Sequence, residues 1–271
     1  MRVAWVTGAS SGIGEALARH LAEEGWAVLA QARRQDRLEK LAQAYPGRIH
    51  PFVGDVRHFE ACQQAVQEAL KTFGRLDAVV ANAGLSHRAR VEEVSLSVLR
   101  EVFEVNFWGA VHAIKAALPE VRARQGWIVG VSSVAGFRGL PARSGYSASK
   151  FALNGFLEAL RTELYGTGVS VLIAAPGFTR SEIREKALTA TGQPQGESPL
   201  PEARLMSAEA VAAAIYRAML RRQKYLLLTT QGRLTVWLNR LFPGWLDRLV
   251  YRHFLREAGS PLAAVPPPGY K

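Results

Sequence analysis

The sequence has almost no cysteine and no long apolar run. Cys62 is the one cysteine among 271 residues, so an internal disulfide is excluded and a reducing compartment is expected. No apolar segment approaches the roughly 20 residues that a transmembrane helix needs. The chain also opens directly with an apolar strand, which argues against a cleaved signal peptide. These absences predict a cytoplasmic protein.

Clustered metal ligands are also missing. The six histidines are scattered, and none stands with cysteine at a spacing typical of a metal site, so no metal is predicted. The net charge of +11 suits an anionic cofactor or an acidic substrate, such as an acyl-carrier or coenzyme A thioester. No groove-reading or RNA-stacking motif is present, and no nucleic-acid partner is predicted. Only seven of the 34 basic residues are lysine, so genome composition also accounts for the excess of arginine.

Apolar segments of strand length alternate with amphipathic helical segments. A chain of 271 residues with 48% hydrophobic residues can bury the core of one α/β domain. Strands are predicted at 3–6, 26–31, 49–53, 76–81, 127–132 and 169–174. Helices are predicted at 15–24, 37–44, 59–73, 98–118 and 146–165. This alternation predicts a doubly wound parallel sheet, which binds ligands at the carboxyl ends of its strands.

A glycine-rich turn joins the first strand to the first helix. Its sequence from Thr7 to Gly14 has the spacing G-x-x-x-G-x-G. Glycines let a backbone approach a pyrophosphate closely, and a helix N-terminus offers free N–H groups. Purely structural turns also use glycine, but the strand–turn–helix context favours a dinucleotide site.

Tyr146 and Lys150 lie one helical turn apart, and therefore on the same face of the expected helix. A nearby positive charge stabilises a phenolate, which brings a tyrosine closer to the range needed for proton transfer. Such pairs are more often solvated surface residues. Here Ser133 ends a strand thirteen residues before Tyr146, which favours chemistry.

In these motifs the sequence resembles the short-chain dehydrogenases/reductases in their single-domain form. The resemblance covers about residues 1–220 and rests on motifs in the family's order: Thr7 to Gly14, Asp55-Val56, Asn82-Ala83-Gly84, Asn106, Ser132-Ser133, Tyr146 with Lys150, and Pro176-Gly177. Ala81 stands where the family often has asparagine. The resemblance implies an α/β, Rossmann-like fold.

The resemblance also implies the site residues. It assigns catalysis to Asn106, Ser133, Tyr146 and Lys150, with Ser132 the less favoured of the two serines. It assigns cofactor contacts to Gly8, Ser10, Ser11, Gly12, Ile13, Gly14, Arg33, Arg34, Asp55, Val56, Asn82, Ala83, Gly84, Tyr146, Lys150, Pro176, Gly177 and Thr179.

The end of the second strand predicts which nicotinamide cofactor is used. An acidic residue there would bind the ribose 2′-hydroxyl of NAD, but Ala32 occupies the position and Arg33 follows. A guanidinium forms charge-assisted bonds to phosphate. We therefore expect NADP(H), with Arg33 as the main ligand of the 2′-phosphate and Arg34 assisting. The alternative is that both arginines merely solvate a loop.

Three further assignments have structural alternatives. Asp55 is expected to accept from the adenine amine, beside the Val56 backbone, but it can also cap the helix that follows. Thr179 resembles the residue that binds the nicotinamide carboxamide, or else it stabilises a turn. Asn106, in mid-helix, is expected to open the helical bonding and hold a water near Lys150; a buried structural amide is the alternative.

The implied function is that of an NADP(H)-dependent carbonyl reductase or alcohol dehydrogenase. Ser133 and Tyr146 would polarise the substrate oxygen, Tyr146 would transfer the proton, and Lys150 would lower the pKa of Tyr146. The long segment after Pro176-Gly177, about 179–206, resembles the family's substrate lid. With Phe137, Leu140 and Phe178 as apolar walls, it predicts a medium-sized, partly hydrophobic ketone, alcohol or 3-oxoacyl substrate. An NADP-binding sensor or scaffold without turnover is the alternative.

Beyond the catalytic domain at 1–220, an amphipathic helical extension is predicted at 221–259. Apolar side chains recur at helical spacing on both sides of Pro243-Gly244, with arginines opposite. Packing over the substrate cleft or at a subunit interface is the favoured interpretation, and weak contact with an anionic membrane surface is the alternative. Residues 260–271 are expected to form a flexible proline-rich tail. The resemblance implies a homodimer or homotetramer.

Overall fold

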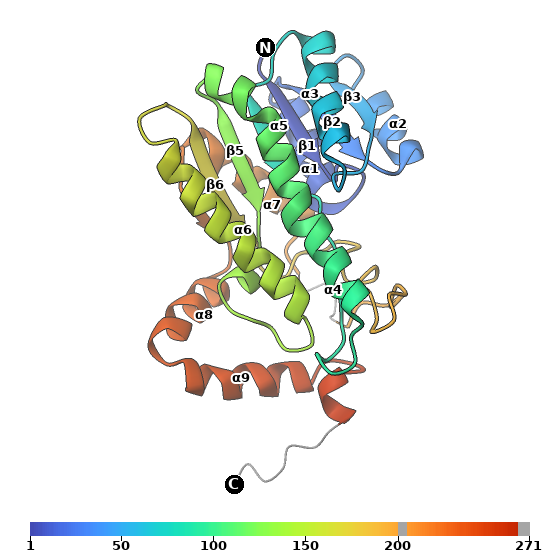
Figure 1. Cartoon of the computed structure of the whole chain (residues 1–271), viewed down its shortest axis with the longest axis vertical. Coiled ribbons are helices and arrows are strands. Elements are labelled where there is room, and N and C mark those ends of the chain that lie inside the picture. Colours follow the sequence, from blue (N-terminus) through green and yellow to red (C-terminus); the bar gives the residue numbers. More distant parts are fainter. Residues whose placement is uncertain (200–204, 265–271) are drawn as a thin grey trace.

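A computed structural model of the chain describes residues 1–199 and 205–264. Part of the expected lid and the end of the expected flexible tail, from 265 onward, lie outside the described residues. Within the described chain, one seven-stranded sheet has the order β3-β2-β1-β4-β5-β6-β7, and every pair is parallel (Figure 1). The strands are β1 Val3–Thr7, β2 Ala27–Ala32, β3 Ile49–Val53, β4 Ala78–Ala81, β5 Trp127–Val131, β6 Ser170–Ala175 and β7 Tyr225–Leu227. The Rossmann-like α/β fold is confirmed.

Helices cover both faces of the sheet. They are α1 Gly12–Glu23, α2 Gln35–Ala44, α3 Phe59–Phe73, α4 Leu96–Phe103, α5 Gly109–Ala123, α6 Ser144–Glu163, α7 Ala208–Leu220, α8 Thr230–Leu241 and α9 Pro243–Leu255. The sequence analysis predicted neither α7 nor β7. Ser207 caps α7 by accepting from the Ala210 N–H, and β7 pairs with β6 although it falls in the segment assigned to the extension.

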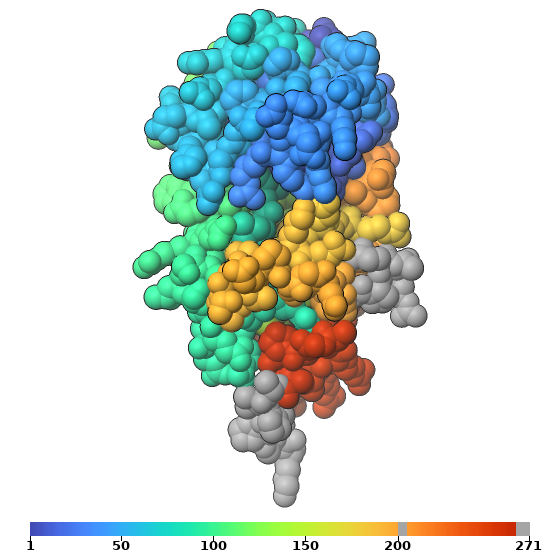
Figure 2. Space-filling view, turned by 90° about the vertical axis from the view of Figure 1, so that its right-hand side faces the viewer, coloured from blue at the N-terminus to red at the C-terminus, as the bar shows by residue number. Residues whose placement is uncertain are grey.

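The extension lies at the opposite end of the molecule from the N-terminus, and the lid lies between it and the first βαβ units (Figures 1 and 2). Arg138 pairs with Asp247 and donates to the Asn239 side chain at 2.8 Å. Arg143 forms a two-bond ion pair with Glu257, at 2.9 and 3.2 Å. The extension therefore packs against the loop that leads into α6. No helix in the described ranges is long and apolar enough to cross a membrane.

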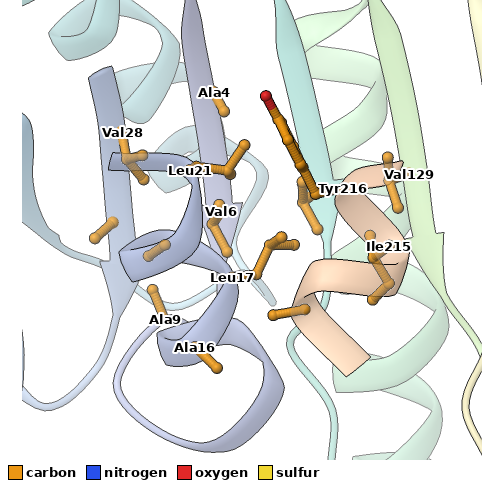
Figure 3. Packing of buried hydrophobic residues seen from close by; sticks show 14 of the residues in the cluster. Ala4, Val6, Ala9, Ala16, Leu17, Leu21, Val28, Val129, Ile215 and Tyr216 are labelled. Atoms are coloured by element: carbon orange, nitrogen blue, oxygen red, sulfur yellow. The ribbon is translucent and has the colours of Figure 1, made fainter. Parts of the chain in front are cut away.

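Two apolar clusters, one on each face, hold the layers together. On one face, Leu17 and Leu21 of α1 meet Ile215 and Tyr216 of α7 over the sheet (Figure 3). On the other face, α3, α5 and α6 cover the sheet, and Cys62 is fully buried there as an ordinary packed thiol. This double covering explains the continuous apolar strands, because each strand is buried on both sides.

Candidate active site

The glycine-rich turn lies at the carboxyl edge of the sheet with almost no space for side chains. Gly8 and Gly12 have positive φ angles of 67° and 57°. A Cβ atom on Gly8 would lie 2.8 Å from Cα of Ala83, and one on Gly14 would lie 2.4 Å from the Gly8 carbonyl oxygen. The Ser11 side chain does not cap α1, so the first N–H groups of the helix remain available. This bare backbone fits the pyrophosphate of a dinucleotide.

The end of β4 is tied directly to this turn. The Asn82 amide donates to the Thr7 carbonyl at 2.9 Å, and the Thr7 hydroxyl accepts from the backbone N–H groups of Asn82 and Ala83 at 3.0 and 3.1 Å. Asn82 thus shapes the site through the turn. Thr7, which was not predicted as a site residue, is part of the same contact; its place at the end of β1 is the sequence signal.

Asn106 lies in a π-helical turn, Glu104–Trp108, inserted between α4 and α5. Its side chain is fully buried, accepts from the Leu85 N–H at 2.8 Å, and donates to the Leu85 carbonyl and the Ser149 hydroxyl, both at 2.9 Å. The π-helical turn opens the helical bonding at this residue, and the bonds of the amide to Leu85 and Ser149 correspond to the alternative of a buried structural amide. A Cβ atom on Gly84 would lie 3.2 Å from Oδ1 of Asn106 and 3.6 Å from Nζ of Lys150, so both groups border Gly84.

Tyr146 and Ser133 meet from different elements. Ser133 follows β5, and its hydroxyl lies close enough to the Tyr146 hydroxyl at the start of α6 to lower the pKa of that phenol. The neighbouring Ser132 is buried, and its hydroxyl has no hydrogen-bond partner among the described residues. The geometry agrees with the choice of Ser133 over Ser132.

Lys150 is buried beneath the tyrosine. Its ammonium donates to the Val131 carbonyl at 2.9 Å and lies 5.9 Å from the centroid of the Tyr146 ring. Burial lowers the pKa of Lys150 from 10.5 to about 8. All four residues expected to be catalytic are therefore within one cluster.

The pKa of Tyr146 is not lowered overall. Burial raises it above the ordinary value, and the hydrogen bond from Ser133 and the positive charge of Arg143 act in the opposite direction. Arg143, buried three residues before Tyr146, was not predicted as part of the site. Its sequence signal was weak because arginine is abundant throughout this chain.

The two arginines after β2 differ in their contacts. Arg33 is exposed and makes no hydrogen bond or ion pair within the described residues. Arg34 donates to the hydroxyls of Ser10 and Ser11 at 2.9 and 2.7 Å and pairs with Glu182 at 3.0 Å. Arg34 is thus an organised part of the turn, and Arg33 presents a free guanidinium beside it.

Asp55 and Val56 lie after β3, at the same edge. Asp55 accepts from the backbone and guanidinium of Arg57, and it does not cap α3, whose N-cap is His58. Burial alone would raise the pKa of Asp55, but the bonds from Arg57 and the nearby positive charges lower it overall. The Val56 carbonyl contacts the ring Nδ1 of His112 at 3.0 Å.

The loop after β6 closes the other side of the site. The Thr179 hydroxyl donates to the Gly177 carbonyl at 3.1 Å, which corresponds to the turn-stabilising alternative. A Cβ atom on Gly177 would lie 2.7 Å from Cγ2 of Thr229, so the start of α8 packs on the Pro176-Gly177 loop. Phe178 stacks on His253 of α9, with ring centroids 6.5 Å apart. The extension therefore contributes to this wall.

A cavity of about 560 Å³ lies between the extension and the outer side of α6. It is lined by Arg138, Leu140, Phe151 and Tyr251 among others, and by none of the four clustered residues. Leu140 therefore faces this cavity. Across residues 1–199 and 205–264, no group of three histidine, cysteine or acidic side chains is placed to hold a metal ion.

Comparisons with known proteins agree with this geometry. Residues 2–191 match the model of the short chain dehydrogenase family. An 11-beta-hydroxysteroid dehydrogenase A of Sesamum indicum is 33% identical, in an alignment that covers 96% of this chain and 77% of that protein. The chain belongs to the short-chain dehydrogenase family and is an oxidoreductase that acts on CH–OH or C=O groups.

Solved structures share the fold of this chain. An alcohol dehydrogenase of Thermococcus sibiricus in complex with 5-hydroxy-NADP is 30% identical, with a TM-score of 0.74 over 84% of this chain and 96% of that one. A short-chain dehydrogenase of Burkholderia phymatum in complex with NAD has a TM-score of 0.80 over 89% of this chain and 93% of that one. At 24% identity, the second shows the fold alone. The fold binds a nicotinamide dinucleotide.

The pKa of Lys150 predicts an alkaline limit to carbonyl reduction. The role that the family resemblance implies for Lys150 requires its positive charge, and kcat/KM should therefore fall as the pH rises through about 8. The folded pKa is below the ordinary value of 10.5, so burial of this charge lowers stability below about pH 8, and the loss is relieved as the pH rises towards 10.5. The pH dependence of kcat/KM measures the limit.

Lys150→Arg keeps its charge across this range, so its profile, at lower absolute rates, should lack the decline near pH 8. Lys115→Arg, an exposed change on α5, should keep the wild-type profile. A decline at the same pH in both variants would assign it to another group.

Proposed function

We propose that this protein is an NADP(H)-dependent carbonyl reductase or alcohol dehydrogenase for a medium-sized, partly hydrophobic ketone, alcohol or 3-oxoacyl compound. The observation that carries the proposal is the cluster of Asn106, Ser133, Tyr146 and Lys150 beside the glycine-rich turn. Three parts of the chain, the π-helical turn, the end of β5 and α6, place these groups together, an arrangement that binding alone does not require.

Each side chain has a distinct role in this proposal. Ser133 and Tyr146 donate hydrogen bonds to the substrate oxygen, and Tyr146 transfers the proton that this oxygen gains or loses. Lys150 favours the phenolate by its charge, and Asn106 holds the π-helical turn and a water that relays protons to Lys150. The bound nicotinamide supplies or accepts the hydride at the carbonyl carbon.

The residues around the turn support NADP(H) as the cofactor. Arg33 is free for the 2′-phosphate, Arg34 is already bonded to Ser10 and Ser11, and no acidic residue replaces Ala32. Asp55, with the Val56 backbone, would bind the adenine edge, and Thr179 would contact the carboxamide. One similar structure holds an NADP derivative. These cofactor contacts are part of the proposal.

Apolar walls support the substrate class. Phe178, which is 38% exposed, lies on the loop after β6 beside the site. The other two expected walls point elsewhere: Phe137 packs against Tyr225 of β7, with ring centroids 6.4 Å apart, and Leu140 lines the outer cavity. The lid and α9 add further cover. The Sesamum indicum relative is named a hydroxysteroid dehydrogenase, and we therefore include hydroxysteroids and oxosteroids among the substrates to test.

The proposed setting is the cytoplasm, and the proposed assembly is a homodimer or homotetramer. The helical segment from α4 to α5 and helix α6 would pair across a two-fold axis. Trp108 and Phe151, each 45% exposed on these elements, support that surface because isolated large apolar side chains gain from being covered.

A weak membrane-surface contact is proposed for the extension. Its exposed face carries large apolar side chains, each at least 40% exposed: Leu234, Trp237, Leu241, Phe242, Trp245 and Leu249. Exposed arginines accompany them at 233, 240, 248, 252 and 256. Apolar side chains beside arginines favour an anionic lipid surface, where the charges add to apolar burial.

Tyr146→Phe separates an enzyme from an NADP-binding sensor. Wild-type protein is first screened with NADPH against ketones, aldehydes, oxosteroids and 3-oxoacyl thioesters by the loss of nicotinamide absorbance. The variant should lose at least about 100-fold in kcat, because the proton donor is removed, with NADPH affinity changed less than about twofold. NADPH binding without turnover across the panel would favour the sensor.

Arg33→Gln tests the cofactor assignment. NADPH affinity should fall about tenfold, because a charge-assisted bond to the 2′-phosphate is lost, while NADH affinity stays the same. Fluorescence titration measures both. Arg48→Gln, at a more distant exposed arginine, serves as the control. Equal losses for both cofactors would show that Arg33 does not recognise the phosphate.

A Trp237→Ser, Trp245→Ser double variant tests the membrane contact. Wild-type protein should sediment with phosphatidylglycerol vesicles at low salt and be released from them by high salt or by neutral lipid. The double variant should sediment severalfold less and keep its turnover of a water-soluble substrate. Tyr165→Ser, at an aromatic residue 91% exposed outside the extension, is the matched control. If wild-type protein stays in solution with both lipids, the proposed membrane contact is wrong.

A further inference from the structure

Three basic side chains form ion pairs with one carboxylate of the lid. Glu182 pairs with Arg34 at 3.0 Å and with Arg37 at 2.5 Å, and the Lys186 ammonium contacts the same carboxylate. Its side chain is 30% exposed, so the cluster lies at the surface and is accessible to a soluble ligand. The bonds from Lys186, Arg37 and Arg34 outweigh burial and lower the pKa of Glu182 to about 2. The carboxylate is therefore ionised at every pH at which the protein would work.

This cluster lies on the glycine-rich turn. Arg34 is bonded to Ser10 and Ser11 by the same guanidinium that pairs with Glu182. A Cβ atom on Gly12 would lie 3.1 Å from Cβ of Ser181, so the lid contacts the turn directly beside this ion pair. In the space-filling view the lid lies against the N-terminal part of the molecule (Figure 2). A segment that is 148 residues away from Arg34 in sequence thus covers the phosphate-binding region.

The ligands of Glu182 are of the kind that a phosphate monoester requires. A guanidinium binds a carboxylate and a phosphate with the same paired N–H groups, so the two anions compete for one arginine. Two anions held side by side would also repel one another. The carboxylate of Glu182 therefore stands in for a phosphate at Arg34 and Arg37.

We propose that Glu182 is a specificity-determining residue: the 2′-phosphate of NADP(H), bound by Arg33, also takes the bonds of Arg34 and Arg37 and so displaces the Glu182 carboxylate from them. This inference rests on the proposed use of NADP(H). Cofactor entry then releases the lid from the glycine-rich turn. NADH has no 2′-phosphate and leaves the ion pairs in place, so the state of the lid depends on which cofactor binds.

Glu182→Gln tests the displacement, with Glu185→Gln as the matched control. Glu185 lies on the same segment, is exposed, and has no side-chain hydrogen bond or ion pair within the described residues. Affinities for NADPH, NADH and adenosine 2′,5′-bisphosphate are measured by calorimetry for the wild type and both variants. Hydrogen exchange of residues 180–199 is followed without ligand and with each nucleotide. Thermal melting shows that the variants fold.

Glu182→Gln should bind NADPH and adenosine 2′,5′-bisphosphate about three- to tenfold more tightly. The substitution removes the carboxylate that competes with the phosphate for these basic side chains, and the ion pairs that are lost are partly exposed. The NADH affinity of Glu182→Gln should not change, and Glu185→Gln should match the wild type throughout. Lid exchange should be faster in Glu182→Gln without ligand. In the wild type, the bisphosphate should accelerate lid exchange and NADH should not.

Unchanged affinity of Glu182→Gln for adenosine 2′,5′-bisphosphate would overturn the inference, as would an equal gain in Glu185→Gln, which would indicate a general charge effect. The proposed function fails separately, if wild-type protein binds NADH more tightly than NADPH. In that case the bisphosphate and the lid exchange still decide the inference, because both report on Arg34 and Glu182 without the nicotinamide.

Discussion

The contact between the glycine-rich turn and the end of β4 is the constraint on which the rest of the site depends. Gly8 and Gly14 are so close to Ala83 and to each other that a side chain at either glycine would displace a backbone segment. The Thr7 hydroxyl accepts from the backbone N–H groups of Asn82 and Ala83, and so ties the start of the turn to the end of β4. The contact with the end of β4 fixes the shape of the turn. In this shape the turn can offer unbonded N–H groups to a phosphate.

The same strand end positions the catalytic cluster. Beyond Gly84, both backbone groups of Leu85 are bonded by Asn106, whose amide also reaches Ser149 on α6. The π-helical turn directs this amide inward while the helix continues on both sides. The cofactor turn and the proton-transfer residues thus share a single hydrogen-bonded framework. A shift at either end would be transmitted to the other through Leu85.

Two ion pairs close this framework from outside. Glu257 of the extension neutralises Arg143, which is buried next to Tyr146, and Glu182 of the lid pairs with Arg34 on the turn. Buried or half-buried arginines need such partners, since an unpaired charge would be poorly solvated there. The chain has a net charge of +11, and these two carboxylates balance the positive charges beside the catalytic cluster and beside the glycine-rich turn. The extension is therefore linked through Arg143 to the proton-transfer residues, and the lid is linked through Arg34 to the glycine-rich turn.

Local spacing along the chain was enough to predict the family, the six strands and the four clustered residues, because apolar runs, a glycine turn and a tyrosine–lysine pair one helical turn apart are local patterns. It also located the two amphipathic helices and the break at Pro243. The partners of Arg143 and Arg34, the pairing of β7 with β6, and the direction of the pKa shift of Tyr146 follow from the folded structure. Each of these joins residues distant along the chain, or depends on burial, and no local pattern carries that information. Arginine is frequent in this sequence, and only folding selects which arginines lose water and require a carboxylate.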